Sequence, residues 1–156
     1  MHKVTRAALG MFLGLSFSGL AMAAEPPATG LGQAWPNAVD VSLSPHWHVY
    51  VFVLNGVKYV QVNDINGNVI GAVGTAGGQF ITLPIGEDSQ YVSTPQQRAA
   101  NTSSINSAAS TTVYRDSSTV VTATPQSDGT TKLTASSAVI CTDPTRCGEI
   151  AVKPTH

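Results

Sequence analysis

The dipeptide Asn55-Gly56 joins two strand-like runs, His46–Leu54 and Val57–Asn63, with no other residue between them. An Asn-Gly pair between alternating apolar residues is the strongest short-range signal for a β-hairpin, because both central residues of a type I′ turn adopt positive φ. The two-residue turn also sets the register, so that Leu54 pairs with Val57 and every residue farther from the turn has a defined partner. The sequence therefore predicts a hairpin over residues 46–63 and predicts which of its side chains share a face.

The predicted register divides the hairpin into two chemically different faces. The apolar face is expected to be the core side and carries Trp47, Val49, Val51, Val53, Val60 and Val62, with Lys58 at its end. The opposite face, which we call the mixed strip, carries His46, His48, Tyr50, Phe52, Tyr59, Gln61 and Asn63. Aromatic rings flanked by amides and imidazoles combine apolar contact with directional hydrogen bonds, as a flat binding site requires. The mixed strip is the candidate binding surface for a saccharide, a small ring or a peptide; the alternative is an ordinary sheet face covered by another segment.

His46 and His48 form an H-x-H pattern on the predicted strand. Side chains alternate along a strand, so both imidazoles point to one side at a spacing of about 7 Å. Two neutral imidazoles can supply two ligands of a divalent transition metal, but a closed site needs further ligands, and the register offers only amides near this pair. Weak metal binding is therefore an alternative function.

Residues 1–23 have the organisation of an export signal. Lys3 and Arg6 precede the apolar run Ala7–Leu20, and Ala21-Met22-Ala23 forms an A-x-A processing site. The apolar run is shorter than the roughly 20 residues that a membrane-spanning helix requires. We therefore expect removal of the signal, a periplasmic or secreted location, and no membrane insertion after cleavage.

Charge and motif content exclude several functional classes. Lys3 and Arg6 belong to the signal, so six basic and nine acidic side chains remain, which argues against nucleic acid as a partner. The patterns G-x-S-x-G, S-x-x-K and H-E-x-x-H are absent, and the glycines do not form a nucleotide-binding pattern. We expect a protein that is not an enzyme and needs no cofactor.

Cys141 and Cys147 are the only cysteines and are separated by five residues. In an oxidising compartment, such a pair is most simply a disulfide that closes a small loop. A redox centre would favour C-x-x-C spacing, and a zinc site would need about two more ligands of this kind. The sequence therefore predicts a structural disulfide.

The remaining patterns predict a mainly β chain. Residues 24–45 form a Pro/Gly-rich leader with Trp35 as an anchor and Ala38–Leu43 as a candidate first strand. Alternating runs separated by turn residues predict an antiparallel meander over residues 46–85. Residues 86–112 form a low-complexity polar loop, in which Thr94 opens a capping-box pattern for a short helical turn through Ala100.

A second hairpin is expected over residues 113–141, with one strand at Val113–Thr124, a turn at Asp128-Gly129 and a return strand from Thr131. Residues 46–156 then form a single β-rich domain of sandwich or barrel type. Its expected function is that of a non-enzymatic binding or interaction module with a protein, peptide or saccharide partner. The alternative is a structural or surface-assembly subunit that uses its sheet edges, and this alternative gains weight if another segment covers the mixed strip.

Overall fold

The computed structural model describes residues 27–100 and 108–138. The predicted signal and both predicted disulfide cysteines lie outside these ranges, so export and the Cys141–Cys147 pairing stay predictions. Within the described ranges, no helix has the length and hydropathy needed to cross a membrane.

The first sheet contains β1 (Trp47–Leu54), β2 (Val57–Asp64), β3 (Val69–Ala76) and β4 (Gln79–Leu83) in the order β1-β2-β3-β4. All its pairings are antiparallel, which confirms the predicted meander. Asn55 and Gly56 have φ of 50° and 80°, as a type I′ turn requires. Leu54 pairs with Val57 and the register continues without a shift to the pair Trp47 and Asp64, as predicted.

The third strand continues through Gly74, Thr75 and Ala76, although glycine is unfavourable inside a strand. Gly77 and Gly78 alone form the connection to β4. The φ angles of 56° and 79° at these two glycines make a second two-residue hairpin turn. The Ile81 side chain leaves little room for any other residue at position 74, because a Cβ on Gly74 would lie only 2.9 Å from it.

The second sheet contains β5 (Val92–Ser93), β6 (Thr111–Arg115), β7 (Thr119–Pro125) and β8 (Thr131–Ser137) in the order β5-β8-β7-β6. The hairpin of β7 and β8 confirms the expected turn near Asp128-Gly129. The prediction of one strand over Val113–Thr124 was wrong, because a tight turn at Asp116 divides it into β6 and β7. The Asp116 carboxylate accepts hydrogen bonds from the backbone N–H groups of Ser118 and Thr119, which stabilises that turn.

The helical turn expected through Ala100 does not form. Thr94 Oγ1 does accept a hydrogen bond from the Gln97 N–H at 3.0 Å, as a cap would, but the chain does not continue as a helix. This segment has no apolar stripe that could bury a helix against the sheets. The one helical element described is instead η1 (Ser89–Tyr91), a short 3₁₀ turn just before β5.

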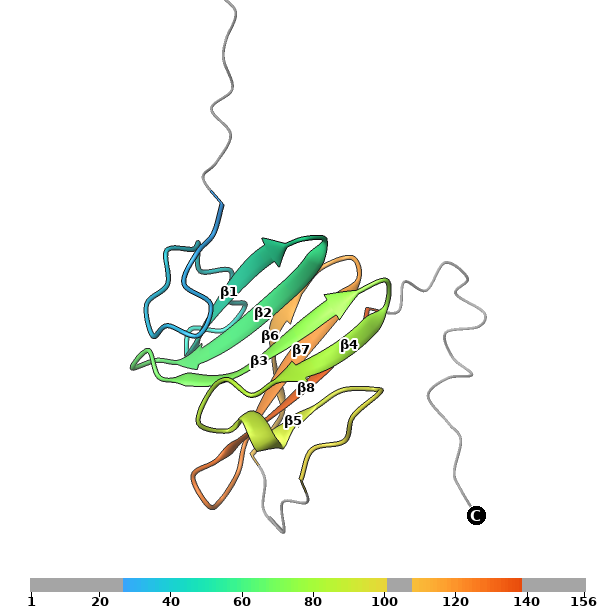
Figure 1. The fold of residues 1–156 in the computed structure, drawn as a ribbon. Coiled ribbons are helices and arrows are strands. Elements are labelled where there is room, and N and C mark those ends of the chain that lie inside the picture. The colour runs from blue at the N-terminus through green and yellow to red at the C-terminus, as the bar shows by residue number, and fades with distance from the viewer. Residues whose placement is uncertain (1–26, 101–107, 139–156) are drawn as a thin grey trace, which may run out of the picture.

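The two sheets stack into an open β-sandwich, not a closed barrel (Figure 1). Its core combines Val49, Val60, Val62 and Val73 of the first sheet with Val113, Val121, Ala123, Leu133 and Ala135 of the second. Gly71 lies where the sheets approach closely, because a Cβ there would be 2.7 Å from Val92 Cγ2. The interleaving of these aliphatic side chains is the main source of stability.

Two valines assigned to the core by the hairpin pattern are less buried than that pattern predicts. Val51 is only partly buried and packs against the core, and Val53 is 66% exposed. Both belong to β1, which is the edge strand of its sheet. A residue on an edge strand loses neighbours on one side, so strand alternation alone overestimates its burial.

The leader ties the two sheets together along the edge formed by β1 and β6. Ala38–Leu43 was expected to be a first strand, but it makes only an isolated bridge between Asp40 and Tyr50. Val41 N–H donates to Val49 O in the first sheet at 2.8 Å, and Leu43 N–H donates to Val113 O in the second at 2.9 Å. The segment therefore spans the gap between the sheets and adds only this single bridge to the first one.

Candidate functional site

The mixed strip lies beneath the leader. Its strand pairs are those predicted, with Phe52 opposite Tyr59, Tyr50 opposite Gln61 and His48 opposite Asn63. However, Gln61 and Asn63 are completely buried, and Phe52 is only 1% exposed. Most of the mixed strip is therefore an ordinary sheet face covered by another segment. Only its ends differ, since Tyr59 is half-buried and His46 is exposed.

Two buried amides hold the leader in place. Gln61 Oε1 accepts from Gly32 N–H at 2.6 Å, and its Nε2 donates to Gln33 O at 2.8 Å. Asn63 Nδ2 donates to Ala34 O at 2.6 Å, and Asn63 Oδ1 accepts from Gln61 Nε2 at 2.9 Å. The amides that looked like ligand contacts thus recognise the backbone of the chain's own leader.

Asp40 fixes the next part of the leader against β1. Its carboxylate accepts hydrogen bonds from the N–H of Val49 at 3.0 Å, from His48 Nδ1 at 2.7 Å and from the N–H of Ser42. Burial by itself raises the pKa of Asp40, but these three hydrogen bonds and the nearby imidazole outweigh it and lower the pKa below its ordinary value. His48 is therefore engaged through one ring nitrogen.

The proposed metal pair is not brought together with further ligands. His46 precedes β1 and is exposed, while His48 Nδ1 is hydrogen-bonded to Asp40. Among residues 27–100 and 108–138, no cluster of three or more His, Cys, Asp or Glu side chains could hold a metal ion.

The outer edge of β1 carries backbone N–H and C=O groups that point away from β2. The turn at Asn55-Gly56 makes Leu54 and Val57 a hydrogen-bonded pair, so Val53, Val51 and Val49 direct their N–H and C=O groups away from β2. Val49 confirms this direction, because its N–H bonds to Asp40 and its C=O to Val41. In the described part of the chain, the N–H and C=O of Val53 and the C=O of Val51 have no backbone partner beyond that edge, whereas the bridge between Asp40 and Tyr50 brings Val39 of the leader alongside the Val51 N–H.

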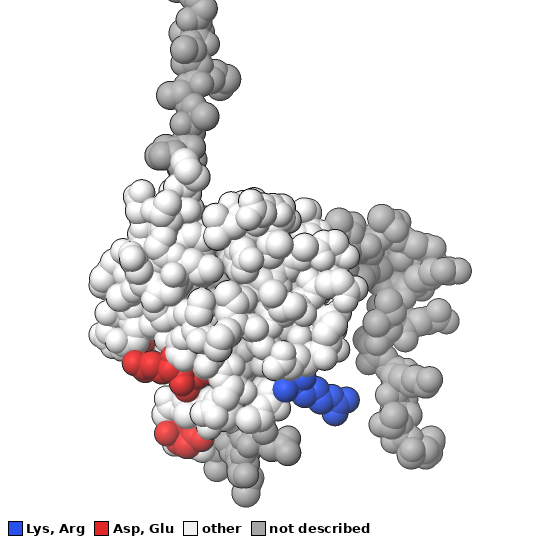
Figure 2. Space-filling view, viewed as in Figure 1, with Lys and Arg blue, Asp and Glu red and all other residues white. Residues whose placement is uncertain are grey.

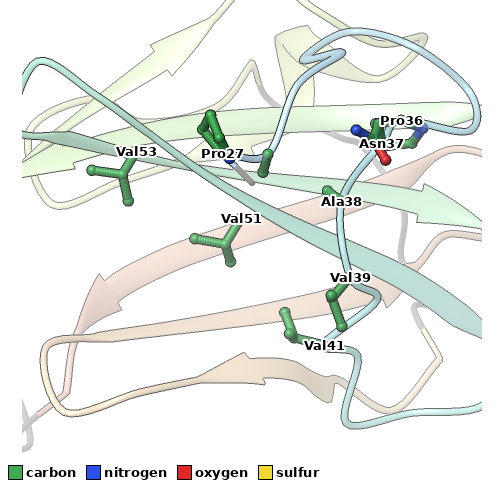
Figure 3. A pocket seen from close by; sticks show the side chains of 9 residues that line it. Pro27, Pro36, Asn37, Ala38, Val39, Val41, Val51 and Val53 are labelled. Atoms are coloured by element: carbon green, nitrogen blue, oxygen red, sulfur yellow. The ribbon is translucent and has the colours of Figure 1, made fainter. Parts of the chain in front are cut away.

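A groove with a volume of about 610 Å³ runs beside this open edge. Figure 3 shows Val51 and Val53 on β1 and Val39 and Val41 on the leader, with Pro27 nearby. Among the described residues that line it, none is charged, and Asn37 is the only polar one.

Exposed apolar side chains concentrate around the groove. Of the eight large apolar side chains exposed in the described residues, five belong to the leader at 39–43 or to the turn end of β1: Val39, Val41, Leu43, Val53 and Leu54. Figure 2, viewed as Figure 1, shows charged side chains only along the lower part of the described surface. The groove is thus an apolar region beside unpaired backbone groups.

Only part of this site can be recognised in the sequence. The valine-rich run of β1 is recognisable as a strand, and an uncovered edge strand of this kind can pair with another chain. Val39 and Val41 belong to the segment that was predicted to be a first strand. Their position beside β1 was not predictable, because sequence periodicity does not indicate which strand such a segment contacts.

The comparisons with known proteins identify no relative. No protein-family model, no curated protein and no solved structure matches this chain.

Proposed function

We propose that this protein is an exported, non-enzymatic interaction subunit that binds an extended, uncharged polypeptide segment by strand addition at the outer edge of β1. The observation that carries the proposal is the combination of outward backbone groups at Val51 and Val53 with an apolar groove beside them. In strand addition, main-chain hydrogen bonds supply affinity and flanking pockets select alternate side chains.

The leader itself supports this mode of binding. Its residues Asp40 and Val41 already pair with β1 at Tyr50 and Val49, in the manner of a short added strand. This pairing reaches Val51 and leaves the backbone groups of Val53 open, so a partner segment would continue along the same edge over Val53. The uncharged lining favours a partner rich in β-branched and other apolar residues.

The burial of the mixed strip also favours strand addition at β1 over ligand binding on the strip. A saccharide or peptide site built on Tyr50, Phe52, Gln61 and Asn63 would require displacement of the leader and loss of its hydrogen bonds. The β1 edge requires no such rearrangement. We therefore favour assembly through the sheet edge over binding on the mixed strip and over metal binding by His46 and His48.

Val53→Lys is expected to weaken this interaction by at least about tenfold, because a lysine on an edge strand opposes strand addition and would put a charge into the apolar groove. Val53 is 66% exposed, so the folded state should change by less than about 0.5 kcal/mol. Binding is measured by calorimetric titration of the mature protein with a capped peptide that alternates valine and threonine.

Ile81→Lys is the matched control, since Ile81 is 56% exposed and lies on β4, the opposite edge strand of the same sheet. Hydrogen exchange with bound peptide should slow at the amide of Val53 and remain unchanged in β4. The proposal fails if the peptide does not bind, if both lysine variants bind it equally, or if protection appears only at β4.

A further inference from the structure

Trp35 is fixed in place and yet left open to solvent. The carbonyls of the two residues before it, Gln33 and Ala34, accept hydrogen bonds from the buried amides of Gln61 and Asn63. Pro36 follows and restricts the backbone on the other side. The side chain is nevertheless 60% exposed. A large ring held rigidly at a surface loses little conformational entropy when a ligand binds to it.

Two neighbours set the orientation of the indole. It lies directly against Gly67, where a Cβ would be 2.5 Å from Trp35 Cε2. The His48 ring meets it edge-on, with centroids 5.2 Å apart and planes at 64°. The indole N–H takes part in none of the hydrogen bonds described for residues 27–100 and 108–138, so it is available as a donor.

The surroundings of the indole are rich in polar groups that are only partly used. Asn66 and Asn68 flank Gly67, and their N–H groups bond to Asp64 and leave their side-chain carbonyls as acceptors. His48 uses Nδ1 toward Asp40, which leaves Nε2 on the ring that contacts Trp35. The nearby carboxylates of Asp40 and Asp64 each accept several hydrogen bonds, so their oxygen atoms are already used within the protein.

We propose that Trp35 is the stacking platform of a binding site for a neutral oligosaccharide. A pyranose ring has an apolar C–H face, which fits an exposed indole, and a rim of hydroxyls, which can bond to the amide carbonyls, the imidazole and the indole N–H. The site is built on Trp35 of the leader and the β2–β3 turn, whereas the groove for strand addition is lined by other residues of the leader and β1. This inference therefore does not depend on the proposed strand-addition function.

The test uses the two tryptophans of the chain as separate reporters. The mature protein labelled with ¹⁵N should show two indole N–H signals, which the Trp35→Phe variant assigns to Trp35 and Trp47. Cellohexaose, chitohexaose, maltohexaose and laminarihexaose are titrated to about 10 mM, a range that detects millimolar dissociation constants. At least one is expected to shift the Trp35 signal to saturation while the Trp47 signal, from a residue packed against the core, stays in place.

Trp35→Ala is expected to weaken that binding by at least about tenfold, and Trp35→Phe to retain part of it, because the smaller ring can still stack. Ile81→Ala is the control for the loss of an exposed apolar side chain elsewhere and should bind like wild type. Peptide binding at β1 should be unchanged in Trp35→Phe. The inference is overturned if none of the four oligosaccharides moves the Trp35 signal, or if Trp35→Ala binds as tightly as wild type.

Discussion

Gln61→Leu is expected to lower the free energy of unfolding by about 3 kcal/mol, because it removes two hydrogen bonds to the leader and deprives the buried Asn63 Oδ1 of its donor. Leucine has a similar volume, but it cannot bond to Gly32 N–H, Gln33 O or Asn63 Oδ1. The leader should then detach more readily from the sheet. Urea unfolding followed by circular dichroism measures the loss, and limited proteolysis within residues 27–43 measures detachment.

Gln33→Leu is the matched control for this prediction. It makes the same chemical change at an exposed residue whose backbone carbonyl, not its side chain, accepts the bond from Gln61. Its stability should remain within about 0.5 kcal/mol of wild type. If Gln61→Leu unfolds at the same urea concentration as Gln33→Leu, the buried amides do not hold the leader as described.

Asp116→Asn is expected to cost about 2 kcal/mol near neutral pH, because this carboxylate joins the two sheets. It forms an ion pair with Lys58 Nζ on β2, accepts from Tyr114 Oη at 2.7 Å, and caps the turn between β6 and β7. Burial alone raises the pKa of Asp116, but the hydrogen bonds from Lys58, Tyr114 and the turn outweigh it and hold the pKa well below its usual range. Because Lys58 and Asp116 both remain partly exposed, solvent screening keeps the cost below that of a buried pair.

The direction of that pKa shift determines the pH dependence. A carboxyl group whose pKa is lower in the folded protein stabilises it fully above the unfolded value of about 3.9 and loses that contribution as the pH falls toward the folded value. The stability difference between wild type and Asp116→Asn should therefore be constant near neutral pH and narrow below about pH 4. Asp128→Asn, in an exposed turn with only local bonds, is the control and should cost much less than Asp116→Asn. A difference that widens in acid would contradict the role given to Asp116.

The parts of the fold that the sequence predicted correctly are those determined locally. Asn55-Gly56 specifies a turn by its own backbone angles, and the alternation beside it determines the register of β1 and β2. The split at Asp116 was missed because the Val/Thr pattern continues on both sides, and only the side chain of Asp116, capping the backbone, interrupts it.

The candidate site was less predictable because it depends on contacts between distant segments. Gln61 and Asn63 were correctly placed on one face, but an amide that binds a ligand and an amide that binds the leader look the same in a sequence. Likewise, Val53 belongs to the apolar face by alternation, and only the order of the strands reveals that it lies at an open edge. Strand order is a non-local property that periodicity does not contain.

The bonds from Val41 to β1 and from Leu43 to β6 also impose an order on assembly. The β1–β2 hairpin can close on its own, whereas the leader has no complete docking surface until β6, far along the chain, has joined the second sheet. Closing such a distant contact is slow compared with closing a hairpin. The residues that leave the ribosome early are thus among the last to reach their final position, and they should be the first to lose amide protection when the native protein begins to open.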